Sequence, residues 1–589
     1  MNPVTYYQEH VEKYQAEVKR LGKRMASFSV LRLLVFLVSG FGVYLFFNAL
    51  QIMIPMLVLG VVLFLYLLSK YTDLKHQRAF NRALIHINED EIEIANGNFY
   101  DRDSGLQFQD PKHFYSLDID LFGRGSFFQF INRTSIKEGT VKLAESLKAN
   151  DILEIASRQN AIKELNEKPQ WRQYYSATSN LVTVETPAKQ IISWLNTHKN
   201  FLPRVMLWLP LVFSAVSVLI IGLTYFGVIT RPEIIGYWLL IGLGVSGIYL
   251  KKINVLASNT DKVRDTFRQY AQLLDLIENE TFLSELLVQK QKEIQAGDKK
   301  ASDIFKAFSK YLDALDNRNN LIGAIFGNGL FLIDLKNSYQ IEQWINQYGS
   351  KVSDWFEVVS FFDAYNSLGT YAYNHPHFEY PELVEKGATI KAKELGHPLL
   401  DNNKRVDSDL CIDKEQFFIV TGANMAGKST FLRTVSLHIV MANMGLPVCA
   451  KSSVYKPIKL ITSMRTSDSL TDDSSYFFSE LTRLKYIVDV IQEDSYFIIL
   501  DEILKGTNST DKAIGSRKFV EKLVASHATG IIATHDLSLC EVEQELEDVK
   551  NYYFDAEIIE DELHFDYKLK QGICQNMNAS FLLKKMDIV

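Results

Sequence analysis

The ten residues Thr421–Thr430, which read TGANMAGKST, constrain the fold more than any other segment of this 589-residue chain. They meet the pattern G-x-x-x-x-G-K-S in full, and they stand between the apolar run Phe417–Val420 and a helical stretch, Phe431–Asn443. In a strand–loop–helix context, successive backbone N–H groups point at phosphates and the helix N-terminus adds its positive end. The sequence therefore predicts an α/β P-loop NTPase domain that binds ATP.

Two positions in this loop carry specific chemistry. We expect Lys428 to bring its charge to the β- and γ-phosphates, and the hydroxyl of Ser429 to ligate Mg²⁺. The other positions contribute backbone N–H groups. The predicted nucleotide-binding residues are Gly422, Ala423, Asn424, Met425, Ala426, Gly427, Lys428, Ser429 and Thr430.

Two later apolar runs end in polar residues that suit phosphate hydrolysis. The predicted strand Tyr496–Leu500 runs directly into Asp501 and Glu502. An acidic residue at the carboxyl end of a buried strand suits Mg²⁺, so we assign Asp501 to the metal and Glu502 to the attacking water. The third predicted strand, Thr529–Ala533, is followed by His535. Taken alone, a histidine after a strand is more often a structural hydrogen-bonding residue than a catalytic one. Its position after the other two motifs favours a γ-phosphate sensor, and the predicted catalytic residues are Glu502, His535 and Lys428.

Long stretches without charge mark a second kind of segment. Leu33–Ser69 contains no charged residue and no histidine, and the same holds for Val205–Thr230 and Ile234–Leu250. Because about 20 apolar residues suffice for a helix to cross a bilayer, the sequence predicts two transmembrane helical hairpins. The alternative is a pair of buried helical hairpins inside a large soluble core.

Basic residues flank both predicted hairpins. The first is preceded by Lys13, Lys19, Arg20, Lys23, Arg24 and Arg32 and followed by Lys70, Lys75, Arg78 and Arg82. The second is preceded by Arg204 and followed by Lys251 and Lys252. Excess Lys and Arg stay on the cytoplasmic side, so we expect a multi-pass protein of the inner (cytoplasmic) membrane with its ATPase domain in the cytoplasm. The four scattered cysteines suit a reducing compartment.

The chain thus divides into alternating helical and apolar segments before the ATPase domain. We expect a basic N-terminal helix at 1–32, transmembrane hairpins at 33–70 and 205–250, helical segments at 71–204 and 251–384, and the ATPase domain at 385–589.

The motifs resemble one family, the MutS ATPases. TGANMAGKSTFLRT is similar to the family's first motif, and LDEILKGTNSTD and ATHD are similar to its later ones. Further back, Asp118–Gly123 and Arg158–Leu165 resemble the start and one helix of the MutS core domain. The similarity covers roughly 110–200 and 255–585, so we expect an all-α MutS-core-like domain that carries the two hairpins, followed by an ABC/MutS-type ATPase domain.

The resemblance implies a Mg²⁺-dependent ATPase that works as a homodimer, hydrolysing ATP to ADP and phosphate. In such dimers one subunit completes the nucleotide site of the other, and the corresponding residues here are Ser475, Asn508 and Ser509. The segment departs from the family where Leu504 and Lys505 replace Gly-Arg and where Asn508 replaces Ser.

The resemblance also implies a nucleotide-gated clamp on double-stranded or branched DNA and a link to DNA mismatch repair. However, the Phe-x-Glu wedge that reads mismatches has one match, Phe478–Glu480, and it lies inside the ATPase signature. We expect no room for a mismatch-reading domain before Asp118. A net charge of −7 gives no argument for nucleic acid. The alternative is a membrane ATPase that acts on a protein or envelope partner without DNA; an ABC transporter is disfavoured because no LSGGQ-type segment occurs.

Overall fold

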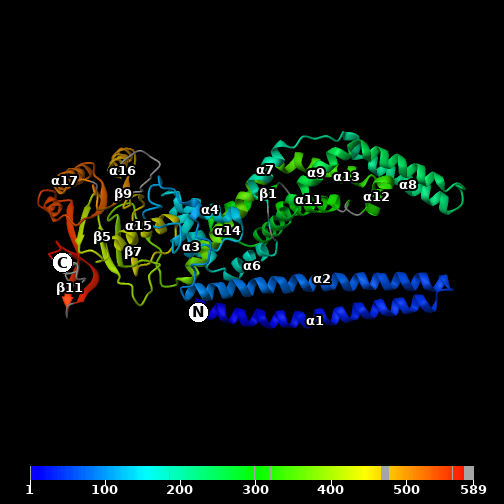
Figure 1. The fold of residues 1–589 in the computed structure, drawn as a ribbon, viewed down its shortest axis with the longest axis horizontal. Helices are drawn as coiled ribbons and strands as arrows, with labels where there is room; N and C mark the ends of the chain where they lie inside the picture. Colours follow the sequence, from blue (N-terminus) through cyan, green and yellow to red (C-terminus); the bar gives the residue numbers. More distant parts are fainter. Residues whose placement is uncertain are drawn as a thin grey trace.

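The structure, a computed structural model, describes residues 2–575 apart from 183, 185, 297–298, 317, 319–320, 466–475, 506 and 560–561. The molecule is elongated, with β-sheets at one end and helices over the rest (Figure 1). Two helical hairpins extend away from the sheets, and both of their turns lie at the opposite end of the molecule. The long apolar segments are thus separated from the P-loop domain by a helical body.

The first hairpin consists of α1 (Pro3–Leu45) and α2 (Leu50–Ala95). In its polar half, Tyr7, Tyr14 and Leu21 are buried at intervals of seven residues, the spacing of a two-stranded coiled coil. Toward the turn the side chains are exposed, and Phe36 is 66% and Phe47 is 70% accessible. Each helix passes without a break through both halves, so the basic N-terminal segment and the first apolar run form one helix.

The helical body follows the first hairpin. Its elements up to the second hairpin are η1 (Leu106–Phe108), α3 (Phe127–Ile131), α4 (Lys137–Lys148), α5 (Ile155–Asn166), α6 (Pro169–Asn180), α7 (Ala188–Thr197) and η2 (Arg204–Leu207). After that hairpin come α10 (Glu285–Glu293), β1 (Gln295–Ala296), β2 (Lys299–Lys300), α11 (Ala301–Asp316), α12 (Leu321–Phe331), α13 (Ile333–Tyr348), η4 (Gly349–Lys351) and α14 (Val352–Asn374). α14 is buried along most of its length, so it forms the central helix of the body.

The second hairpin, α8 (Leu209–Tyr225) and α9 (Glu233–Asn279), has an apolar partner that the sequence analysis missed. The short apolar helix α12 packs against it so closely that a Cβ on Gly242 would lie 2.2 Å from the carbonyl oxygen of Gly329. The hydroxyl of Ser217 donates to the carbonyl of Leu330 at 2.5 Å. Of the described helices, α1, α2 and α9 are long and apolar enough to cross a membrane, while α8 and α12 are shorter.

Two sheets form the C-terminal domain. The six-stranded sheet has the order β12-β11-β6-β10-β9-β8, parallel except for β12 at the edge, and the four-stranded sheet has the order β3-β7-β4-β5. The strands are β3 (Glu382–Leu383), β4 (Ile390–Leu395), β5 (Ser408–Ile412), β6 (Phe417–Gly422), β7 (Ser452–Tyr455), β8 (Lys459–Ser463), β9 (Tyr496–Asp501), β10 (Thr529–Ala533), β11 (Val549–Ile559) and β12 (Glu562–Gln571). The helices are α15 (Lys428–Met444), α16 (Tyr476–Val490), α17 (Ser509–Ala525) and η5 (Leu537–Gln544).

Both faces of the parallel sheet are covered, which explains why its strands are continuous apolar runs. On β6, Phe418 and Val420 face α15 and share one core with the helical body. Phe417 and Ile419 face the other way and pack with residues of α16, α17 and η5. The helix α15 therefore lies between the sheet and the body, and it begins at the P-loop.

Hydrogen bonds connect the helical body to the ATPase domain through a short segment that precedes α3. The carboxylate of Asp118 accepts hydrogen bonds from the hydroxyl of Thr462 and from the backbone N–H groups of Met464 and Arg465. The Arg465 guanidinium in turn donates twice to Asp120, at 2.5 and 2.8 Å. These bonds join the end of β8 to the body.

Candidate nucleotide site

A cavity of about 640 Å³ opens at the carboxyl ends of β6, β9 and β10. In parallel sheets with helices on both faces, ligands bind at this edge. The predicted residues that line the cavity are Asn424, Met425, Ala426, Gly427, Lys428, Ser429, Thr430, Asp501, Glu502 and His535. The structure thus brings together side chains from three segments that are up to about a hundred positions apart in the sequence.

The loop between β6 and α15 depends on its glycines. Gly427 has φ of +102°, a value that L side chains rarely adopt, and α15 begins at the next residue. At the other end, a Cβ on Gly422 would lie 2.8 Å from the carbonyl oxygen of Phe554 on the neighbouring strand β11. The two glycines therefore allow the tight path that turns the loop's N–H groups toward the cavity.

Lys428 is held over the loop rather than extended into solvent. Its Nζ donates to the carbonyl oxygens of Gly422 and Ala423, at 2.8 and 3.0 Å, and lies 3.2 Å from Nε2 of His535. Burial lowers the pKa of Lys428, although the carboxylates of Glu502 and Asp501 oppose that shift. The Lys428 side chain thus places a positive charge in the cavity, where the P-loop, the Asp501–Glu502 segment and His535 meet.

Ser429 and Asp501 form a small oxygen-rich edge beside Lys428. The Ser429 hydroxyl donates to Oδ2 of Asp501 at 2.7 Å. Hard oxygen ligands of this kind suit Mg²⁺, which is usually held by one or two protein groups together with phosphate and water. Among the described residues no cluster of three or more His, Cys, Asp or Glu side chains could hold a metal ion alone. The hydroxyl and carboxylate oxygens of the pair therefore fit a Mg²⁺ ion that arrives with a nucleotide.

Glu502 follows Asp501 and is held by two basic groups. Its Oε1 lies 2.8 Å from Nε2 of His535, and its Oε2 lies 3.6 Å from Nζ of Lys505. The hydrogen bond from His535 lowers the pKa of Glu502 to about 2, against the opposing effect of partial burial. The backbone of Glu502 has φ of +50°, and its N–H donates to the carbonyl of Ala533. The carboxylate is thus ionised and fixed in place at neutral pH.

The opposite wall of the cavity comes from segments to which the sequence analysis gave no site role. Leu395, His397, Lys404 and Val406 come from the region of β4 and β5, and Phe554 and Tyr567 come from β11 and β12. Burial, with the nearby guanidinium groups of Arg433 and Arg405, lowers the pKa of His397 to about 4, so its ring is neutral at pH 7.

Of the three predicted dimer-contact residues, the two that the structure describes stand apart from this cavity. Asn508 caps α17, because its Oδ1 accepts from the N–H of Asp511 at 2.9 Å, and both Asn508 and Ser509 are exposed. Neither lines the cavity. Ser475 lies outside the described residues. The Glu480 carboxylate accepts from the N–H groups of Leu504 and Lys505, so it anchors the loop that follows Glu502.

Known proteins are similar to the C-terminal part of this chain. The sequence model of MutS domain V matches residues 418–584. The DNA mismatch repair protein MutS of Staphylococcus haemolyticus (strain JCSC1435) is 30% identical over 240 residues, which are 40% of this chain and 27% of that protein. The protein of the same name from Staphylococcus aureus (strain JH9) is 29% identical over 261 residues, 42% of this chain and 29% of that protein. The chain therefore spans less than a third of the length of these relatives.

Proposed function

We propose that this chain, which belongs to the MutS family through its C-terminal region, is a membrane-anchored ATPase that works as a homodimer on DNA. One observation carries the proposal: Lys428, Ser429, Asp501, Glu502 and His535 line a single cavity at the carboxyl edge of a parallel sheet. That cavity has the volume of a small-molecule site.

Each of these side chains suits one part of ATP hydrolysis. The loop N–H groups and Lys428 hold the phosphates, while Ser429 and Asp501 hold the Mg²⁺ that neutralises phosphate charge. Glu502, already ionised and fixed by His535, orients or deprotonates the attacking water. His535 lies between Glu502 and Lys428 and senses the γ-phosphate.

The proposal of a dimer rests on the open side of the cavity. Met425, in the middle of the P-loop, is 78% exposed, although it lines the nucleotide cavity. A second subunit that covers this side would exclude water from the phosphates, which strengthens electrostatic interactions there. Ser475, Asn508 and Ser509 remain our candidates for that contact.

Membrane anchoring is supported by the exposed apolar surface of the hairpins. Leu34 is 51%, Phe41 is 63% and Leu59 is 69% accessible, and a contiguous surface of this kind is covered by lipid or protein in stable molecules. Both hairpin turns lie at one end of the molecule, as a single bilayer requires (Figure 1). Because basic residues flank the apolar runs on the side of the helical body, the proposal puts the ATPase domain on the cytoplasmic side of the inner membrane.

A second candidate has its own support. The relatives named for DNA mismatch repair are matched over less than a third of their length, so their other regions have no counterpart in that match. A membrane ATPase that moves a protein or envelope partner would need the same nucleotide site and no DNA. An ABC transporter remains a third and weaker reading.

DNA binding by the detergent-purified chain separates the first two candidates. We expect affinity for duplex or branched DNA that falls steeply as salt rises, because counterions are released on binding. ATPase rates measured with and without the same DNA panel give a second readout. Absence of binding to duplex, mismatched or branched DNA at about 50 mM salt would exclude the DNA clamp and favour the protein partner.

A further inference from the structure

A polar cavity lies where the base of the first hairpin meets the helical body, and it shares no lining residue with the nucleotide site. It has a volume of about 100 Å³ and is lined by α1, α2, α6 and α14 together with the loops on either side of α3. Its lining includes three arginines, Arg102, Arg133 and Arg172, and two carboxylates, Asp90 and Glu91. The formal charge of these five groups is therefore positive by one.

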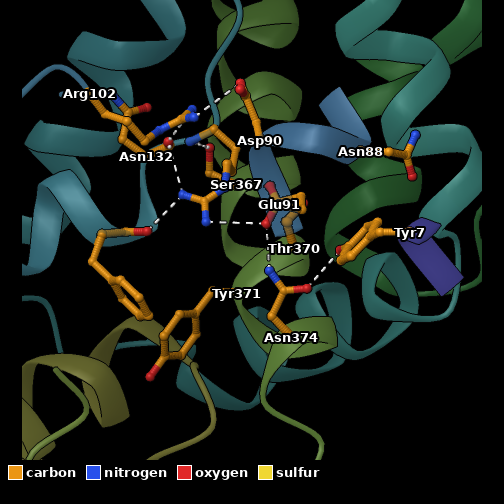
Figure 2. Close-up of polar contacts among 12 residues, drawn as sticks. Tyr7, Asn88, Asp90, Glu91, Arg102, Asn132, Ser367, Thr370, Tyr371 and Asn374 are labelled. Carbon is orange, nitrogen blue, oxygen red and sulfur yellow. Dashed lines mark hydrogen bonds and ion pairs between the residues drawn. The ribbon is translucent and has the colours of Figure 1, made fainter. Parts of the chain in front are cut away.

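Both carboxylates are already neutralised by two of the arginines. Arg133 donates to both oxygens of Glu91, at 2.5 and 3.3 Å, and Arg102 donates to Asp90 at 3.2 Å. Figure 2 shows the network continuing from Glu91 to Asn374, which donates at 2.7 Å and accepts from the Tyr7 hydroxyl at 2.7 Å. Glu91 is buried and the Arg133 side chain is 11% exposed, so the pair is largely shielded from solvent.

Among the arginines of this cavity, Arg172 is the one without an ion-pair partner in the described part of the chain, although the more distant Glu91 carboxylate still acts on it. It is 4% exposed; its Nε donates to the carbonyl of Leu165 at 2.7 Å, its Nη1 donates to the hydroxyl of Thr370, and its guanidinium lies 5.5 Å from the ring of Tyr373. Its Nη2 has no hydrogen-bond partner. Within the described part of the chain, no carboxylate lies within ion-pair distance of Arg172. A buried cation in this position is costly unless an anion accompanies it.

The same helix face offers further polar groups. Arg172, Ser176 and Asn180 follow one another at intervals of four on α6, so they share one face, and all three line the cavity. A guanidinium group presents its donors in a fork that matches the oxygens of phosphate or sulfate, and hydroxyl and amide groups can bond the remaining oxygens. The volume admits a small anion and is well below that of a site for a nucleoside.

We propose that this cavity binds an inorganic oxyanion of phosphate or sulfate size, held by Arg172 with Ser176 and Asn180. The anion supplies the missing counter-charge and joins α6 to the base of the first hairpin. The site is separate from the nucleotide cavity, and its occupancy needs neither ATP turnover nor DNA.

Thermal unfolding of the full chain in detergent tests this proposal. Because the P-loop also attracts phosphate, the parent protein carries Lys428→Ala, and chloride keeps the ionic strength constant. We expect phosphate or sulfate to raise the unfolding temperature saturably, by roughly 2–4 °C, and calorimetry to show one site per chain. Arg172→Gln in this parent should remove the response, whereas Arg124→Gln, at an exposed position, should keep it.

A second variant covers the case in which Arg172→Gln fails to fold. Ser176→Asp puts a carboxylate one helical turn from Arg172, so it should raise the unfolding temperature without phosphate and abolish the response to phosphate. An equal response in the parent, Arg172→Gln and Ser176→Asp proteins would overturn the proposal, and so would a response no larger than that to chloride. An Arg172-dependent response to AMP would overturn the assignment to an inorganic anion.

Discussion

Oε1 of Glu502 lies 2.8 Å from Nε2 of His535, at the place where two neighbouring parallel strands end. Since the strands β9 and β10 are paired residue by residue up to Asp501 and Ala533, the spacing of the two side chains is set by the sheet. The nearby Nζ of Lys428, 3.2 Å from the same imidazole nitrogen, connects this pair to the P-loop. A change at the γ-phosphate, which Lys428 is expected to contact, would therefore alter the position of Glu502 through His535.

The first prediction concerns Glu502. Glu502→Ala should leave ATP binding intact and lower turnover by about 10²–10⁴-fold, because general-base assistance is lost while the phosphate contacts remain. Nucleotide binding and phosphate release are measured on the same preparation. Glu493→Ala, at an exposed position, is the control; normal hydrolysis by the Glu502 variant would show that another group activates the water.

The second prediction concerns Lys428. Lys428→Ala should weaken ATP binding by roughly 10- to 100-fold, since a charge-assisted hydrogen bond contributes about 1.5–3 kcal/mol. Titration with a fluorescent ATP analogue gives the dissociation constant. Lys518→Ala, on an exposed part of α17, should bind as the parent does. Equal affinity in both variants would contradict the assignment of Lys428 to the phosphates.

The third prediction is a pH dependence of stability from Asp363, which is fully buried on α14. Its oxygens accept from the N–H groups of Ser135 and Ile136, yet burial raises its pKa to about 7. In the unfolded chain the group ionises near its usual value, 3.8, so the folded state holds the extra proton between those two values. Stability from this group is therefore highest at low pH and falls, by at most about 1.4 kcal/mol per pH unit, as pH rises toward 7.

Asp363→Asn should flatten that slope, because the amide oxygen still accepts both N–H groups and cannot ionise. Unfolding temperatures between pH 5 and 8 provide the measurement. Asp354→Asn, at an exposed position of the same helix, should keep the parent's slope. Identical slopes in all three proteins would mean that Asp363 is ionised in the folded chain.

The fourth prediction tests the hairpin in the membrane. Because the second hairpin would hold the chain in the membrane by itself, this test uses a parent in which Leu219→Lys and Leu240→Lys disable that hairpin, and every variant below is made in this parent. Lysine at the centre of a membrane helix costs about 2.5–3.5 kcal/mol, so Leu34→Lys combined with Phe41→Lys should then release the chain during alkaline extraction. The matched control is Gln8→Lys with Gln15→Lys, which has the same seven-residue spacing on the polar half of α1 and should stay membrane-bound. Retention of both double variants in the pellet would contradict insertion of the first hairpin.

The P-loop edge of the sheet could be predicted because its chemistry is local. The strand, the loop and the first residues of α15 are contiguous, so spacing alone placed Gly422, Lys428 and Ser429. Asp501 and His535 followed because parallel strands end at a common edge. The six-stranded order itself, with β11 beside β6, depends on long-range pairing and was not specified in advance.

Features that depend on tertiary approach escaped the sequence analysis. The wall formed by Lys404 and Val406 arises because the loop before β5 approaches the P-loop, which no local pattern shows. The helix α12 is too short to be recognised from its sequence as a membrane-spanning segment. Its place beside the second hairpin becomes apparent only from its contacts with α8 and α9. Nothing in the sequence of α6 marks Arg172 as unusual, and its burial without an ion-pair partner becomes apparent only once α2, α6 and α14 are packed together.

The length of the first hairpin has a mechanical consequence. At 1.5 Å per residue, the 43 residues of α1 extend about 65 Å, while the hydrocarbon part of a bilayer is about 30 Å thick. For a chain inserted as proposed, roughly 35 Å of each hairpin helix stands clear of the lipid. The hairpin thus acts as a rigid spacer between the bilayer and the hydrolytic domain, and its polar half is braced against α6 of the helical body through Tyr14, Leu84 and Ala177.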